Sequence, residues 1–208
     1  MKRIPSLSRK TYVTNDGKRL LKVYNSPIPV MFLDFMRTVL SLVILQPQID
    51  FINVRTRINN EITSRKKIKM AASKILKYSF EEKSIIESFV DGVSADKYLE
   101  STNDVIIAGK IGKFTGGLHK QGMALVDNRP KNYIINDKIT RVDLEMFREG
   151  ASEFDKMCDL LSFVESFDDM RIRQAFLKGH NKSCSCGYNA YIGLLCKLFL
   201  KTAKHWDD

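Results

Sequence analysis

The sequence predicts an α+β fold of two lobes, a small β-rich lobe followed by a mainly helical one. Three observations support this prediction. Short strand-like runs dominate the first 90 residues, helical periodicity dominates the remainder, and an Asp-Gly break at residues 91–92 separates the two parts. We therefore assign residues 1–90 to the amino-terminal lobe and residues 91–208 to the carboxy-terminal lobe.

The distribution of charge separates the same two regions. The chain has 208 residues, of which 44% are hydrophobic and 28% charged, a composition typical of globular proteins rather than disordered ones. Residues 1–70 hold 14 Lys and Arg against 4 Asp and Glu, whereas residues 71–208 hold 20 of each, so the net charge of +10 belongs to the first third. Such a lobe suits a polyanionic partner such as RNA, and an ordinary solvated basic surface explains it equally well.

The first lobe begins with residues that favour a β-hairpin. Two β-prone runs within residues 11–24 flank an Asn-Asp-Gly turn at residues 15–17. An apolar helix is then expected over residues 30–45, and we treat residues 30–50 as an insert. The sequence leaves open whether this insert packs on the lobe or binds a partner.

The insert is also the best candidate for a membrane segment. Asp34 and Arg37 interrupt it, and the uninterrupted run from Val39 to Leu45 is much shorter than the roughly 20 apolar residues that a spanning helix needs. No signal peptide is recognisable, and the four cysteines form no disulfide framework. We therefore expect no membrane span and a cytoplasmic location.

A very basic helix and two short strands complete the predicted first lobe. The helix is expected over residues 53–70, and the strands around residues 74–78 and 84–90. If this lobe binds RNA, its phosphate contacts are expected from Arg55, Arg57, Arg65, Lys66 and Lys67.

The second lobe is predicted to be helical around one short hairpin. Apolar residues recur at helical intervals of four, three and four over residues 103–119, which indicates a buried helix. A hairpin is expected over residues 133–142, and helices thereafter. The last of them carries an aliphatic stripe, which we interpret as core.

The residues that suggest chemistry lie between the buried helix and the end of this hairpin. Asp127 precedes Asn132 by five positions, Arg129 lies between them, and Asp143 follows the hairpin. Phosphoryl transfer from ATP uses one carboxylate near the acceptor hydroxyl, a second carboxylate and an amide oxygen on Mg²⁺, and a cation near the transferred phosphate. The four residues supply these groups at one end of the hairpin.

This segment resembles the protein-kinase superfamily. The six residues from Asp127 to Asn132 are similar to that family's catalytic loop, Asp-x-Lys-Pro-x-Asn, and Asp143-Leu144-Glu145 occupies the place of its Asp-Phe-Gly motif. The resemblance covers about residues 10–165. It implies that Asp127 is the base, Arg129 the phosphate cation, and Asn132 and Asp143 the magnesium ligands.

The first lobe supplies the remaining parts that the resemblance requires. Lys22, in the second strand of the hairpin, resembles the lysine that binds the ATP phosphates, and Glu61 resembles its ion-pair partner. The strand that holds Glu87, Phe89 and Val90 resembles the hinge whose backbone binds adenine. Departures from the pattern are the missing glycine-rich loop and the glutamate in place of the motif's glycine.

Among kinase-like families, the chain most resembles the small kinase subunit of the KEOPS tRNA-modification complex. The Arg55-Thr56-Arg57 run followed by Glu61 carries this likeness, and the RIO and lipopolysaccharide-type kinases are looser matches. The resemblance implies an atypical serine/threonine protein kinase or ATPase that uses ATP and Mg²⁺ and acts on a protein substrate or with a partner subunit.

Three alternatives remain open at this point. The first alternative is a catalytically inactive kinase-fold scaffold that binds RNA or protein, and the second is a small-molecule kinase. The third concerns His180, Cys184 and Cys186, which are close in sequence but lack the spacing of a usual zinc finger. We interpret them as ordinary loop residues.

Overall fold

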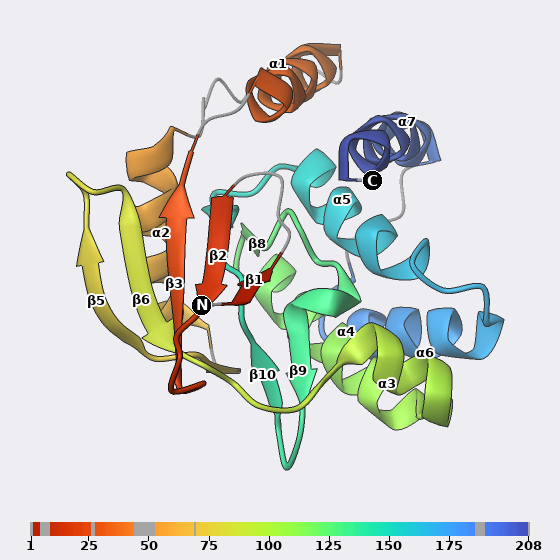
Figure 1. The fold of residues 1–208 in the computed structure, drawn as a ribbon. Helices are drawn as coiled ribbons and strands as arrows, with labels where there is room; N and C mark the ends of the chain where they lie inside the picture. Colours follow the sequence, from red (N-terminus) through yellow and green to blue (C-terminus); the bar gives the residue numbers. More distant parts are fainter. Residues whose placement is uncertain are drawn as a thin grey trace.

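The computed structural model describes residues 2–4, 9–25, 28–43, 53–68, 70–185 and 190–207. In Figure 1, the strands of the first lobe stand on the left and most helices of the second lobe on the right. The predicted order of a β-rich part followed by a helical part is confirmed.

An antiparallel sheet forms the first lobe. Its strands, in spatial order, are β1 (Lys2–Ile4), β2 (Arg9–Val13), β3 (Arg19–Tyr24), β6 (Ser84–Ser88) and β5 (Ile75–Ser79). The predicted hairpin is the pair β2–β3, and Gly17 in its turn has a positive φ of 67°. Strand β1 has only three residues and was not predicted.

Helix α2 (Val54–Lys67) covers one face of this sheet. Asn53 caps it by accepting a hydrogen bond from the Thr56 amide at 2.8 Å. Ile58 packs against the sheet residues Tyr24 and Ile85, and all three are buried. The helix makes this apolar contact despite its basic composition. Its charged residues Arg57 and Glu61 are buried on the same helix, whereas Arg55, Lys66 and Lys67 are exposed.

The apolar insert forms helix α1 (Ile28–Val43), which lies apart from the sheet in Figure 1. It packs against α7 (Ala190–Asp207) of the second lobe, and Leu40 contacts the buried cluster that contains Phe154 and Cys158. Residues 44–50 of the insert lie outside the described residues. Within the part of the chain that the structure describes, no helix has the length and apolar character to cross a membrane.

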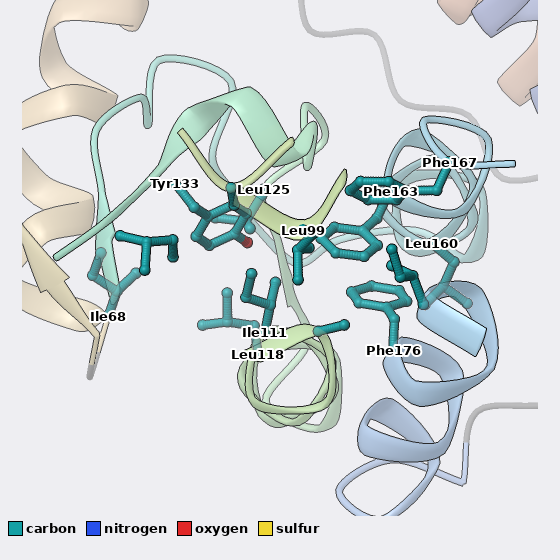
Figure 2. Close-up of a cluster of buried hydrophobic side chains, with 14 of the residues drawn as sticks. Ile68, Leu99, Ile111, Leu118, Leu125, Tyr133, Leu160, Phe163, Phe167 and Phe176 are labelled. Atoms are coloured by element: carbon teal, nitrogen blue, oxygen red, sulfur yellow. The ribbon is translucent and has the colours of Figure 1, made fainter. Parts of the chain in front are cut away.

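Five α-helices occur among the described residues of the second lobe. They are α3 (Ala95–Thr102), α4 (Val105–Lys120), α5 (Glu153–Val164), α6 (Met170–Asn181) and α7. Figure 2 shows the core that α3, α4, α5 and α6 share, in which Phe163 of α5 stacks on Phe176 of α6 at a centroid distance of 4.0 Å. The predicted buried helix is α4; α3 is too short to give a periodic signal.

Glycines allow α4 and α6 to cross closely. A Cβ on Gly112 would lie 2.0 Å from the Phe176 carbonyl oxygen, and one on Gly116 would lie 2.4 Å from that of His180. Gly179 of α6 meets the backbone of α4 in the same way. The backbones of α4 and α6 are therefore in direct contact at these glycines, and no larger residue fits there without moving the two helices apart.

A small sheet connects the lobes, because its strand β4 (Ala71–Ala72) belongs to the first lobe and its other strands to the second. This sheet has the order β4, β10 (Ile139–Arg141), β9 (Tyr133–Ile135) and β7 (Val93–Ser94), and β11 (Arg148–Glu149) pairs with β8 (Met123–Ala124). The predicted hairpin is β9–β10. Since β4 runs parallel to β10, the segment that leaves α2 is tied to the hairpin that lies next to Asp143.

Candidate active site

Lys22 is the centre of a buried ion-pair cluster. Its side chain is 2% exposed, and its Nζ lies 2.9 Å from Glu61 Oε1 and 2.9 Å from Glu87 Oε1. Arg65 pairs with both carboxylates, at 2.6 Å from Glu87. Burial alone would lower the pKa of Lys22, but the charges of Glu61 and Glu87 outweigh it and raise that pKa. The ammonium group is therefore charged and held in place.

The same ammonium group reaches the segment that precedes Asp143. Lys22 Nζ donates to the Val142 carbonyl oxygen at 3.1 Å. The charge of Asp143 is among the influences that raise the pKa of Lys22. The cluster of the first lobe therefore borders the motif of the second.

Arg9, at the start of β2, binds Asp143 directly. Its Nη2 donates to Asp143 Oδ2 at 2.7 Å and its Nη1 to Oδ1 at 3.2 Å. Burial alone would raise the pKa of Asp143, but the charges of Arg9 and Lys22 more than offset it and hold that pKa far below its ordinary value. The sequence analysis missed Arg9, because no local pattern marks a residue that contacts a partner 134 positions away.

Glu145, which takes the place of the expected glycine, joins β2 to α2. Its Oε2 lies 2.8 Å from Arg9 Nη1 and 3.0 Å from Arg57 Nη2. Arg57 is 1% exposed and its guanidinium lies 5.1 Å above the Tyr24 ring. Helix α2 is thus connected to the Asp143 motif through an ion pair that the glycine of the usual motif could not form.

The loop between β8 and β9 brings Asp127, Arg129 and Asn132 together. Arg129 binds the Asp127 carboxylate through two donors, at 2.6 and 2.8 Å, and Asn132 Nδ2 donates to Asp127 Oδ2 at 3.2 Å. Burial would raise the pKa of Asp127, but the Arg129 guanidinium outweighs it and lowers that pKa. Asp127 is therefore ionised at neutral pH, with its side chain 24% exposed.

The backbone of this loop is strained and firmly held. Val126, immediately before Asp127, has a φ of 65°, a region that β-branched residues rarely adopt. On one side of it, the Leu125 amide donates to Asp159 Oδ2 at 2.8 Å. On the other side, Arg141 Nη2 donates to the Asp127 carbonyl oxygen at 2.6 Å. These bonds maintain a conformation that Val126 alone would not favour.

Arg141 also connects the loop to the second carboxylate. Its Nε donates to the Asp143 carbonyl oxygen at 2.8 Å, and its guanidinium lies 4.7 Å above the ring of Tyr133. One buried side chain thereby fixes the backbones of Asp127 and Asp143 relative to each other. The sequence contained only a weak signal for this role, an arginine in the second strand of a short hairpin.

A row of buried polar side chains from α4, α5 and α6 supports the loop that contains Asp127. His119 of α4 lies between Asp159 of α5, at 3.1 Å from its Oδ2, and His180 of α6, at 3.0 Å from its Nε2. Burial raises the pKa of Asp159 and lowers that of His180. His180 therefore has a structural partner, and no group of three or more metal-binding side chains occurs among the described residues, which include Cys184 but not Cys186.

The solved structures that are similar to this chain include an aminoglycoside phosphotransferase. The chain is similar to the streptomycin–ATP complex of APH(2″)-IIa, with a TM-score of 0.53 and 9% identity over 98% of this chain and 86% of that one. Its similarity to aminoglycoside phosphotransferase APH(3″)-Id from Streptomyces rimosus has a TM-score of 0.51 and 11% identity, over 97% and 92% of the two chains. It is also similar to WbdD bound to a kinase inhibitor, with a TM-score of 0.55 and 15% identity, but spans only 45% of that chain.

This is a protein-kinase-like fold. The likeness is structural, since no protein-family model and no curated protein matches the sequence. In this kinase-like fold, Lys22 of the first lobe reaches the carbonyl oxygen of Val142, the residue before Asp143 in the second.

The expected hinge residues of the kinase-like fold have different environments. Glu87 is buried in the ion-pair cluster with Lys22, so its side chain positions the lysine. The Phe89 amide donates to the Lys18 carbonyl oxygen at 2.9 Å, which uses its hydrogen-bond donor. The adenine contacts expected from the backbone of Glu87, Phe89 and Val90 stay a prediction.

The basic helix presents fewer cations to solvent than the sequence suggested. Arg57 and Arg65, two of the five expected phosphate contacts, point inward and pair with buried carboxylates. Arg55, Lys66 and Lys67 are exposed, and Lys67 pairs with Glu149. Any polyanion that binds α2 would therefore meet three of the five residues.

The residues between the lobes fit a magnesium ion. Carboxylate and amide oxygens are the hard ligands that Mg²⁺ prefers. Asn132 uses its amide nitrogen in its bonds to Asp127, which leaves its amide oxygen for a metal. Asp143 offers an ionised carboxylate that already holds a cation, the guanidinium of Arg9.

Proposed function

We propose that this chain is an ATP- and magnesium-dependent phosphotransferase. The observation that carries the proposal is the position of Lys22, whose ammonium group pairs with Glu61 on one side and contacts the carbonyl next to Asp143 on the other. A fixed cation beside a metal-binding carboxylate is the arrangement that a nucleotide phosphate requires. The kinase-like fold, shared with the neighbours named above, supports the same conclusion.

Each residue then has a defined role. Lys22, positioned by Glu61 and Glu87, binds the nucleotide phosphates, while Asn132 and Asp143 hold Mg²⁺, which neutralises charge on the phosphates when it is bound. The acceptor hydroxyl hydrogen-bonds to Asp127. Its oxygen forms a bond to the γ-phosphorus, the bond from that phosphorus to the β–γ bridging oxygen breaks, and the hydroxyl proton passes to Asp127. Arg129 balances the charge near the transferred group.

The acceptor is either a protein or a small molecule. The likeness to the KEOPS kinase subunit in the Arg55–Glu61 region favours a protein acceptor or a partner subunit, with serine or threonine as the target. The structural neighbours that cover most of both chains include APH(2″)-IIa and aminoglycoside phosphotransferase APH(3″)-Id, which favours a small hydroxylated molecule. Exposed Arg55 and Lys66 make an RNA-associated role in the cytoplasm compatible with either.

A second candidate is a kinase-like scaffold that does not transfer phosphate. Two ion pairs favour it: Arg129 neutralises Asp127, and Arg9 neutralises Asp143. If these pairs persist when nucleotide is present, neither carboxylate can perform its catalytic role. A protein in that state would still bind partners through its lobes.

Nucleotide binding and labelled-phosphate transfer distinguish the two candidates. We expect the wild-type chain to bind ATP more tightly with Mg²⁺ than without it, measured by calorimetry. Transfer from γ-labelled ATP should then appear on a protein, an RNA or an aminoglycoside acceptor, or as released phosphate. Magnesium-dependent binding without any transfer would favour the scaffold, and no ATP binding at all would contradict the phosphotransferase assignment.

A further inference from the structure

Arg9 and Lys22 project toward Asp143 from the same face of the sheet. In the β2–β3 register, Thr11 lies opposite Lys22 and Arg9 lies opposite Tyr24, so the four side chains share one face. The Arg9 guanidinium reaches both carboxylate oxygens of Asp143 and also Glu145, with its side chain 11% exposed. It is therefore a largely desolvated cation at the position where the proposed metal ligand offers its oxygens.

We infer that Arg9 is an internal counter-cation that competes with the divalent metal for Asp143 and must leave this carboxylate before the metal binds. This inference rests on the proposed function, because it assigns a metal to Asp143. It adds a residue that controls metal affinity and that the resemblance to kinases did not include.

Electrostatics and hydrogen-bond geometry require the competition. Both Asp143 oxygens accept a guanidinium N–H, so Arg9 occupies the side of the carboxylate that it faces, and a metal ion that approaches from that side must displace the guanidinium. Two cations at one carboxylate would also repel each other at short distance in a poorly solvated site. Metal binding in the absence of nucleotide must therefore overcome the Arg9–Asp143 pair.

Glu145 keeps Arg9 near the site after it leaves Asp143. The Arg9 Nη1 lies 2.8 Å from Glu145 Oε2, and Arg57 holds the same oxygen from α2 at 3.0 Å. The released guanidinium stays beside the metal site, where phosphate oxygens of a nucleotide would offer it new acceptors. Nucleotide and metal should consequently increase each other's affinity, since each removes an obstacle to the other.

Metal titration in the absence of nucleotide tests the inference. Using Mn²⁺ as the probe and electron paramagnetic resonance to count free metal, we expect Arg9→Gln to bind Mn²⁺ about tenfold or more tightly than wild type, a typical coupling between two sites. The matched control is Arg19→Gln, which removes an arginine that is 57% exposed on the neighbouring strand and pairs with Asp16. It should leave the Mn²⁺ affinity unchanged.

Two further variants make the result decisive. The double variant Arg9→Gln, Asp143→Asn should lose the gain in Mn²⁺ affinity, because the carboxylate that benefits is absent. Arg9→Lys retains a charge but not the two-donor geometry, so it should show a smaller gain and serves if Arg9→Gln does not fold. Equal or weaker Mn²⁺ binding in the folded Arg9 variants, or a gain that persists in the double variant, would overturn the inference.

These outcomes are separable from those of the proposed function. If Arg9→Gln gains Mn²⁺ affinity through Asp143 but no form of the protein binds ATP, the internal counter-cation stands and the phosphotransferase assignment fails. If wild type transfers phosphate but Arg9→Gln gains no affinity for Mn²⁺, the assignment stands and the role of Arg9 is wrong.

Discussion

Lys22 and Glu61 are 39 positions apart in the sequence, yet the Lys22 ammonium donates to Glu61 Oε1 at 2.9 Å in the interior of the first lobe. The strand β3 supplies the cation and the helix α2 supplies the anion. Because Glu87 of β6 contacts the same ammonium group, three elements of the lobe converge on one charge. This convergence makes the orientation of α2 and the position of Lys22 interdependent.

Replacing Lys22 should destabilise the protein strongly. Lys22→Met leaves Glu61 and Glu87 buried with Arg65 as their shared cation, and loss of one member of a buried ion-pair cluster costs roughly 3–5 kcal/mol. Urea denaturation measures this difference in unfolding free energy. Lys18→Met, which removes an exposed lysine from the hairpin turn, should change it by less than about 0.5 kcal/mol. Equal effects of the two substitutions would show that the buried cluster does not stabilise the lobe.

The contribution of Glu61 to stability should depend on pH. Burial alone would raise its pKa, but Lys22 and Arg65 outweigh it and lower that pKa below the ordinary value of 4.5. A carboxylate with a lowered folded-state pKa contributes stability above its unfolded-state pKa and loses that contribution as the pH falls through the folded-state pKa.

Glu61→Gln should therefore destabilise the protein at pH 7, and the difference from wild type should shrink as the pH falls below about 4.5. Chemical denaturation at a series of pH values measures it, with Glu82→Gln, an exposed glutamate of the first lobe, as the control. A difference that stays constant across this range would mean that the ionised form of Glu61 is not what stabilises the lobe.

Gly112 and Gly117 of α4 should respond to alanine in opposite directions. A Cβ on Gly112 would lie 2.0 Å from the Phe176 carbonyl oxygen, so Gly112→Ala must push α4 and α6 apart, at a cost of roughly 1–3 kcal/mol or more. A Cβ on Gly117 has no atom within 4 Å, so Gly117→Ala should stabilise the helix by about 0.5–1 kcal/mol. Thermal unfolding of the two variants compares them directly. The close crossing is wrong if Gly112→Ala is as stable as Gly117→Ala.

Asp127→Asn tests the proposed base without a large change in shape. The amide cannot accept the acceptor's proton as a carboxylate does, so phosphate transfer or ATP hydrolysis should fall by about 10²-fold or more. ATP affinity should change little, because Lys22 and Asp143 remain. Asp137→Asn, in the exposed turn of the β9–β10 hairpin, is the control and should retain full turnover. Unaltered turnover in Asp127→Asn would exclude Asp127 as the base.

Local patterns predicted most elements of the fold. The Asn-Asp-Gly turn indicated the β2–β3 hairpin, and apolar residues at helical intervals indicated α4, because both signals depend on neighbours within a few positions. The Asp127-to-Asn132 spacing likewise identified the loop that holds the proposed base. Short elements such as β1 and α3 gave no comparable signal, since their stability comes from their contacts rather than from their own residues.

The pairing of charges could be predicted only in part. Glu61 and Arg65 are four positions apart on a helix, and their local pair was foreseeable. Arg57 and Arg65 were expected among the surface cations, together with Arg55 and Lys66, because all four look alike in a basic helix. Their burial depends on which side of α2 faces the sheet, and the helix's weak apolar pattern does not specify that side.

The sequence by itself determined the two-part order of strands and helices, because this order follows from local periodicity. It also contained, at a recognisable spacing, the residue types that the proposed phosphoryl transfer would use. Only the tertiary structure decided which charges meet. The Arg9–Asp143 pair spans 134 positions and forms because β2 and the end of the β9–β10 hairpin approach each other when the lobes pack. A guanidinium can pair with any carboxylate that lies within reach, whatever its distance in sequence. The fold therefore decides which carboxylate Arg9 meets.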